Sequence, residues 1–246
     1  MTLPDNVQPI GILAKRSSDA VRARQIADDL GAILLSNHKE PEGLVLEVSC
    51  SGFALRDFDQ KKSHPFRLDT TQLRHVGAGR DLLSRALGKK CFSVIDATAG
   101  FGSDSFDFLR RGFQVTAIER VPIIALMLRE ASSRIADIDW SGRFRVIEGE
   151  ATEWIPRLPS ADVIFVDPMF PDVEKKSAQP RKAQQLLRRL AGSDSGSGDL
   201  INMARNFAKR RVVVKRPRSA PSMGAEPDHR FMGRSIRYDV YFSGAS

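Results

Sequence analysis

Three short polar segments of this 246-residue chain carry residue types that could do chemistry. The first is Asp96-Ala-Thr-Ala-Gly100-Phe-Gly102-Ser103-Asp104. Its two glycines leave the backbone bare, so a ligand can approach the loop closely. A helix that begins near Ser103 directs free N–H groups toward a carboxylate or phosphate, and Asp96 and Asp104 are suited to receive an ammonium group. The segment therefore predicts a loop that binds a ligand carrying both kinds of charge.

The second segment ends in Glu119, the last residue of the next apolar stretch, VTAIE. Its interval from the glycines is roughly the one at which an acidic residue binds ribose hydroxyls. Ser105 stands where a dinucleotide fingerprint needs its third glycine, and the chain has no GxxxxGK[ST] segment. Asp96 precedes the first glycine by four positions, as is usual in sites for S-adenosylmethionine, which we expect as the cofactor. The alternative is a tight strand–helix turn with a surface glutamate.

The third segment is Asp167-Pro168-Met169-Phe170-Pro171, which resembles the (Asp/Asn)-Pro-Pro-(Tyr/Phe) motif of enzymes that methylate planar amino groups. The Asp167 carboxylate and the Pro168 carbonyl could accept the two N–H bonds of such an amine. They would orient its lone pair and stabilise the positive charge that develops on nitrogen. Phe170 offers a flat surface on which a target base could stack. The alternative is a proline-rich turn with a core phenylalanine.

These segments need a sheet that brings strand ends together. From Cys91 onward, apolar strands alternate with helical stretches, which predicts a parallel sheet with helices on both faces. Ligands bind at the carboxyl ends of the strands in such folds. We expect an α/β, Rossmann-like class I methyltransferase sheet, mostly parallel with antiparallel C-terminal strands. The expected strands cover residues 92–97, 114–119, 144–148, 163–167 and 212–215, and a final pair lies within 230–242.

The beginning of the chain reads differently. Residues 1–75 are expected to form a small α+β segment, and residues 76–246 the larger domain. In the segment, Ser17 and Ser18 could cap a helix that runs to Leu30 and stops at Gly31. Its expected strands lie at residues 10–13, 44–48, 53–58 and 66–68.

Charge favours a polyanionic partner. The chain has 38 basic and 30 acidic residues, a net charge of +8. Between Arg205 and Asp239, ten basic residues face three acidic ones. Basic surfaces bind phosphates because binding releases counterions, so nucleic acid is a natural partner; the alternative is a solvated basic face. A second basic cluster is Lys175, Lys176, Arg181, Lys182, Arg188 and Arg189.

Other classes of site find little support. The two cysteines, Cys50 and Cys91, form no CxxC, and the four histidines are scattered, so we expect neither a disulfide framework nor a metal. The longest uncharged apolar run, Val121–Leu128, is too short to span a bilayer. The N-terminus lacks the pattern of a secretory signal. We therefore expect a cytoplasmic protein with no membrane partner.

Taken together, the segments DATAGFGSD, IER, VDPMFP followed by KKSA, and VVVKRP resemble the RsmJ-type methyltransferases. Those enzymes modify the N2 of a guanine in bacterial small-subunit ribosomal RNA. The similarity extends over about residues 77–217. It implies an S-adenosylmethionine-dependent enzyme whose partner is 16S rRNA or the small ribosomal subunit. It also implies cofactor contacts, with Glu150 and Ala151 flanking the adenine, at Ser103, Asp104, Glu119, Arg120, Glu150, Ala151 and Asp167.

The resemblance extends to the expected RNA contacts. Lys215 and Arg216 match the family's Lys-Arg-Pro element, and Gly77-Ala-Gly79-Arg80 matches its glycine-rich segment in part. Ser103 stands where relatives often carry arginine. The expected RNA-binding residues are Lys175, Lys176, Arg181, Lys215 and Arg216. Two alternatives stay open: a methyltransferase acting on DNA, a protein amide or a small amine, and a non-catalytic RNA-binding protein on the same scaffold.

Overall fold

The computed structural model describes most of the chain: residues 10–36, 40–60, 63–68, 70, 81–134, 142–168, 182–191 and 197–244. The chain forms two compact units, which are described separately. The first comprises the described parts of Met1–Thr70, Leu126–Arg134 and Pro171–Ser193, and the second comprises the remainder. The boundary expected between residues 75 and 76 lies outside the described residues.

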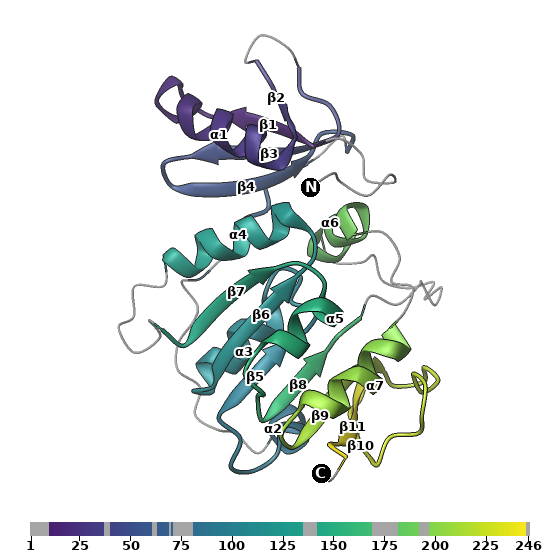
Figure 1. Cartoon of the computed structure of the whole chain (residues 1–246). Helices are drawn as coiled ribbons and strands as arrows, with labels where there is room; N and C mark the ends of the chain where they lie inside the picture. Colours follow the sequence, from purple (N-terminus) through teal and green to yellow (C-terminus); the bar gives the residue numbers. More distant parts are fainter. Residues whose placement is uncertain are drawn as a thin grey trace. The chain divides into compact units, whose positions relative to one another are not determined.

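The first unit contains a four-stranded sheet in the order β2-β1-β3-β4 (Figure 1). Strand β1 pairs in parallel with β2 and β3, and β3 forms an antiparallel hairpin with β4. The strands expected at residues 10–13, 44–48 and 53–58 are confirmed to within one residue, whereas Phe66 forms only one isolated bridge, with Leu55. The strands are β1 (Gly11–Ala14), β2 (Ile33–Leu34), β3 (Leu44–Ser49) and β4 (Gly52–Asp57).

Helix α1 (Ala20–Leu30) also belongs to the first unit. Gly31 ends it in the left-handed conformation, as predicted, and its N–H bonds the carbonyls of the last turn. The predicted cap at Ser17 or Ser18 is wrong, because both residues form a 3-10 turn, η1 (Ser17–Asp19). A capping residue needs an extended backbone, and Arg16 is the extended residue at this point.

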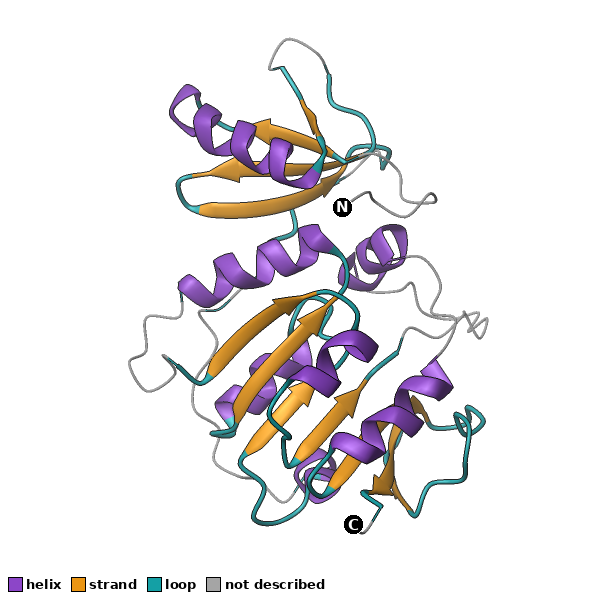
Figure 2. Ribbon diagram, in the orientation of Figure 1, coloured by secondary structure: helices purple, strands orange, loops and turns teal. Residues whose placement is uncertain are grey.

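The second unit is built on a seven-stranded sheet in the order β10-β11-β9-β8-β5-β6-β7 (Figures 1 and 2). Five neighbouring strands of this sheet, β9, β8, β5, β6 and β7, run parallel. Strand β11 pairs antiparallel with both β9 and β10. The expected fold class is therefore confirmed. The strands are β5 (Ser93–Asp96), β6 (Gln114–Glu119), β7 (Phe144–Glu148), β8 (Val163–Val166), β9 (Arg211–Pro217), β10 (His229–Met232) and β11 (Ile236–Phe242).

Helices cover both faces of this sheet, as Figure 2 shows. On one face, α3 (Ser103–Arg110) places Phe108 against Phe165 of β8, with ring centroids 4.9 Å apart. On the other, α5 (Ala151–Trp154) and α7 (Ser197–Phe207) bury apolar residues with Val166 and Val214. The second unit also contains α2 (Leu82–Leu87) and η2 (Ile155–Arg157), and the first unit contains α6 (Lys182–Ala191). The helix α4 (Pro122–Ser133) begins in the second unit and belongs to the first from Leu126 onward.

Within the described ranges, no helix combines the length and apolar character that crossing a membrane requires.

Candidate active site at the carboxyl ends of the parallel strands

The sheet brings the three chemically promising segments to one edge. Strands β8, β5, β6 and β7 are neighbours and run in the same direction, so their carboxyl ends lie side by side. Asp96 ends β5, Glu119 ends β6 and Asp167 follows β8 directly. Residues that are far apart in the sequence are thus presented together, as predicted for ligand binding in this class of sheet.

The glycine loop between β5 and α3 has the conformation that its sequence suggests. Gly100 and Gly102 both adopt positive φ, 53° and 79°, which residues with a Cβ rarely do. Gly102 directly precedes α3, and no side chain caps this helix. The first N–H groups of α3 therefore lack a capping oxygen, which suits them to a ligand carboxylate.

Asp96 lies beneath this loop and is almost completely buried. Its carboxylate accepts hydrogen bonds from the Ser105 hydroxyl, at 2.5 Å, and from the Thr98 N–H, at 3.3 Å. Burial raises the pKa of Asp96 to about 7, since the Ser105 bond only partly offsets it and the Asp104 carboxylate adds to it. The structure thus gives Asp96 a role in holding the loop, and its contact with a cofactor ammonium stays a prediction.

Glu119 joins two backbone segments at the edge of the sheet. One carboxylate oxygen accepts the Gly100 N–H and the other accepts the Val121 N–H, both at 2.7 Å. The glutamate thereby fixes the glycine loop relative to the start of α4, and its predicted bond to ribose stays a prediction. Beside it, the Arg120 guanidinium lies 3.9 Å from the Glu150 carboxylate, which links the ends of β6 and β7.

The segment after β7 has a feature that sequence reasoning missed. Gly149 adopts a φ of +139°, and a Cβ there would lie 2.4 Å from Nε1 of Trp154. That indole N–H donates to the Glu148 carbonyl at 3.1 Å and so closes the turn. Glu150 then precedes α5 as its N-terminal flanking residue with an exposed side chain, while Ala151 is buried. A glycine directly after a strand was the available signal.

The centre of the site is an ion-pair network on the α3 face of the sheet. The Lys215 ammonium of β9 lies 2.9 Å from an Asp167 oxygen and 2.7 Å from an Asp104 oxygen. The Asp167 N–H donates to the Thr98 hydroxyl at 2.7 Å, which fixes the backbone after β8. The Asp167 side chain stays 31% exposed, so a substrate can still reach it. One ammonium thus joins β9, the end of β8 and the first turn of α3.

The network sets the ionisation states of the Asp167 carboxyl group and the Lys215 amine. Burial raises the pKa of Asp167 to about 6; the Lys215 ammonium opposes this shift, and the Asp104 carboxylate adds to it. Although burial acts to lower the pKa of Lys215, the two carboxylates raise it above its ordinary value. Tyr238 of β11 lies opposite Lys215 in the strand register, and burial raises its pKa to about 12. At neutral pH the site therefore contains mostly ionised Asp167, charged Lys215 and neutral Tyr238.

The remaining predicted residues are distributed as follows. Pro168 is buried directly after Asp167. Lys215 and Arg216 were expected to contact RNA; Lys215 pairs with the two aspartates, and Arg216 is 5% exposed and donates to the Pro221 carbonyl. Their RNA contact stays a prediction. The predicted residues that lie outside the described part of the chain are Phe170, Lys175, Lys176 and Arg181.

The donor set suits S-adenosylmethionine. Carboxylates at the ends of β5 and β6 can accept hydrogen bonds from an ammonium group and from ribose hydroxyls, and the uncapped α3 can receive a carboxylate. The two left-handed glycines allow close approach of a bulky group to the loop. Among the described residues, no group of three or more His, Cys, Asp or Glu side chains is arranged to hold a metal ion.

Comparison with known proteins agrees with this geometry. A family model described as "Putative SAM-dependent methyltransferase" matches residues 31–243. A protein of Thioalkalivibrio sulfidiphilus named "Ribosomal RNA small subunit methyltransferase J" is 41% identical over 240 residues, which cover 91% of this chain and 93% of that protein. A Coxiella burnetii protein of the same name is 37% identical over 232 residues, covering 89% and 91%. The chain belongs to this methyltransferase family.

A solved structure supports the fold. The crystal structure of a SAM-dependent methyltransferase from Neisseria gonorrhoeae superimposes with a TM-score of 0.71 at 27% identity, over 96% of this chain and 98% of that one. The resemblance to RsmJ-type methyltransferases and the class I fold are therefore confirmed. The protein is an S-adenosylmethionine-dependent methyltransferase, and the network around Asp167 lies at the carboxyl ends of the parallel strands, the edge where open α/β sheets bind ligands.

Proposed function

We propose that this methyltransferase modifies the exocyclic N2 amine of a guanine in 16S ribosomal RNA, free or within the small ribosomal subunit, in the cytoplasm. One observation carries the proposal: an ionised carboxylate, Asp167, is anchored by Lys215 at the end of β8, beside the loop that fits the cofactor. The names of the relatives and the net charge of +8 favour an RNA substrate.

The chemistry follows from the weakness of the nucleophile. The lone pair of a guanine amine is delocalised into the ring. S-adenosylmethionine, when bound, supplies an electrophilic methyl group on a sulfonium sulfur. The Asp167 carboxylate and the Pro168 carbonyl accept the two N–H bonds of the amine and aim its lone pair. When the methyl group passes from sulfur to the amine, positive charge would develop on nitrogen. Asp167 would stabilise that charge and receive the surplus proton. Phe170 would stack on the base.

Lys215 acts as a positioning residue in this scheme. Its ammonium holds the Asp167 oxygen at 2.9 Å and is itself held by Asp104. Without this cation, burial and the neighbouring carboxylates would favour protonated Asp167, which cannot accept a proton from the amine. The pairing therefore keeps the acceptor both ionised and oriented before the substrate arrives.

The cofactor would be held along the adjoining strand ends. Glu119 would bind the ribose hydroxyls, and Glu150 with Ala151 would flank the adenine. The methionine end would lie at the glycine loop, where Asp96 and Asp104 supply negative charge. The other residues assigned to the cofactor are Gly100, Gly102, Ser103, Arg120 and Asp167.

The test is methyl transfer from radiolabelled S-adenosylmethionine to small ribosomal subunits and to naked rRNA from cells that lack the enzyme. We expect labelled N2-methylguanine in small-subunit rRNA after nuclease digestion and mass spectrometry. Double-stranded DNA and bulk protein serve as competing substrates and should stay unlabelled. Label in DNA or protein, with none in rRNA, would refute the proposed substrate. Cofactor binding without transfer to any of them would refute the proposed substrate and favour a small amine as the methyl acceptor. Failure to bind the cofactor would favour a non-catalytic RNA-binding protein.

A further inference from the structure

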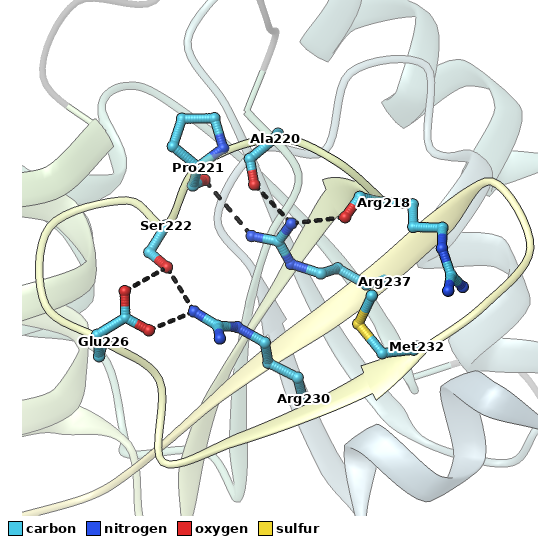
Figure 3. Close-up of a pocket in the computed structure, with 8 residues that line it drawn as sticks. All are labelled: Arg218, Ala220, Pro221, Ser222, Glu226, Arg230, Met232 and Arg237. Atoms are coloured by element: carbon cyan, nitrogen blue, oxygen red, sulfur yellow. Dashed lines mark hydrogen bonds and ion pairs between the residues drawn. The ribbon is translucent and has the colours of Figure 1, made fainter.

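A second polar site lies away from the Asp167 network, on the C-terminal hairpin of the sheet. It is a pocket of about 520 Å³ beside β10 and β11, closed on one side by the loop after β9 (Figure 3). Three of its lining residues are arginines and only one is acidic. The lining residues are Arg218, Ala220, Pro221, Ser222, Glu226, Arg230, Met232 and Arg237.

Arg237 builds the rigid wall of this pocket. It pairs with the buried Asp239 at 2.7 and 2.9 Å. It also donates to the carbonyls of Arg218 and Ala220 at 2.8 and 2.6 Å, as Figure 3 shows. The loop is thus tied to β11 through one guanidinium. Burial and the neighbouring Arg237 cation lower the pKa of Arg216, whereas the Asp239 carboxylate opposes this shift, so two cations share one carboxylate behind the wall. An anion bound in the pocket would relieve that repulsion.

The open side of the pocket already holds an anionic group. Arg230 donates to the Ser222 hydroxyl at 2.7 Å and to the Glu226 carboxylate, and the same hydroxyl donates to Glu226 at 3.0 Å (Figure 3). A guanidinium and a hydroxyl therefore converge on one pair of carboxylate oxygens. This is also the donor arrangement that binds a phosphate. The Glu226 side chain is 76% exposed, so it is held weakly and can be displaced at little cost.

We propose that Arg230 and Ser222 bind a backbone phosphate of the RNA substrate, and that Glu226 occupies this site when no RNA is bound. The proposal rests on the proposed function, since it takes the substrate to be RNA. The two non-bridging oxygens of a backbone phosphate can accept from the guanidinium and the hydroxyl at once, as the two Glu226 oxygens do. RNA binding would then release Glu226 to solvent.

The strand register gives the distance between this site and the target amine. Arg230 pairs with Asp239, Asp239 with Val214, and Val214 with Val166 at the end of β8. Three strand spacings of about 4.8 Å place the two sites roughly 14 Å apart along the sheet. Because side chains alternate, Arg230 lies on the face opposite to Lys215. The bound phosphate would therefore belong to a nucleotide several steps away from the target guanine.

Substitutions at this site that should weaken RNA binding, and one that should strengthen it, test the proposal. RNA binding is measured by fluorescence anisotropy with labelled small-subunit rRNA at several salt concentrations. We expect Arg230→Ala to weaken binding and to reduce the slope of log K against log salt by about 0.7 to 0.9, the loss of one phosphate contact. Ser222→Ala should weaken binding to a lesser degree. Glu226→Gln should strengthen binding at low salt, because it removes the competing carboxylate.

Two controls separate a specific site from general charge. Lys209→Ala removes one exposed cation at the opposite, amino end of β9 and should leave the slope unchanged. When Arg230→Ala is already present, adding Glu226→Gln should not strengthen RNA binding. Weaker binding by Glu226→Gln, or equal losses in the Arg230 and Lys209 variants, would overturn the phosphate site. Failure of the unmodified protein to bind or methylate rRNA would instead refute the proposed function. Thermal melts confirm that each variant is folded.

Discussion

The Lys215 ammonium lies 2.9 Å from the Asp167 carboxylate, although Asp167 follows β8, Lys215 belongs to β9, and two helices, α6 and α7, lie between them in the sequence. Strands β8 and β9 run parallel, and Val166 pairs with Val214. The residues that follow them, Asp167 and Lys215, therefore lie side by side at the edge of the sheet. Parallel pairing thus converts a loop aspartate and a strand lysine into one unit. The consequences of this unit can be measured.

Asp167→Asn should lower kcat by about 100-fold or more, the range expected when a group that takes part in proton transfer is lost. The amide keeps the shape of the side chain but carries no negative charge and cannot take up the proton. Single-turnover methylation of rRNA at saturating S-adenosylmethionine measures the effect. A kcat close to that of the unmodified enzyme would remove Asp167 from the mechanism.

The acidic limb of the pH–rate profile should follow the ionisation of the Asp167 carboxyl group. Activity requires its ionised form, so kcat/KM should fall as the pH drops through about 6. Lys215→Met should move this limb to higher pH, because the groups left facing Asp167 are Asp104, Asp96 and the neutral Tyr238.

Lys215→Arg is the matched control, since it retains the cation and should keep the limb close to its original position. Carboxyl ¹³C NMR of the cofactor-free protein reports the same titration without any turnover. An unshifted titration in Lys215→Met would assign the lysine a purely structural role.

Stability should carry a separate pH dependence through Asp96. Its pKa in the folded state, about 7, lies above the ordinary value of 3.8, so the folded protein binds this proton more tightly than the unfolded chain does. The resulting stabilisation is complete below about pH 4 and is lost as the pH rises to about 7. Asp96→Asn removes the titration, so its stability relative to the unmodified protein should improve between pH 5 and pH 8. Urea unfolding at both pH values measures the change; a constant difference would contradict it.

Glu119→Gln should weaken binding of S-adenosylmethionine by about tenfold or more, because hydrogen bonds to a charged group are worth about 1.5–3 kcal/mol. The variant also loses one of the two acceptors that hold the Gly100 and Val121 N–H groups. Isothermal calorimetry gives the Kd. Glu153→Gln, on the exposed side of α5, is the matched control and should bind normally. Equal Kd values for both variants and the unmodified protein would refute the ribose assignment.

The local sequence was sufficient to predict the strands whose carboxyl ends form the candidate site. The parallel strands are short stretches that contain β-branched residues, and β5, β6 and β7 each end in an acidic residue, so their positions follow from pattern alone. The partners of Lys215 could not be predicted in this way, because Asp104 is 111 residues distant and meets the lysine only through the order of the strands. The contact between Gly149 and Trp154 likewise depends on how the turn folds back. The 3-10 turn at Ser17 arises from backbone bonding, with which a side-chain cap competes poorly.

The alternation of side chains along β10 and β11 has a consequence for substrate choice. Arg230 and Lys215 project from opposite surfaces of one sheet, so a short linear oligonucleotide would have to bend around the β10 edge to engage both. A branched or helical RNA presents backbone on two sides of a base that is swung outward. The enzyme would then select its substrate by the tertiary shape of the nucleic acid more than by the base sequence next to the modified nucleotide.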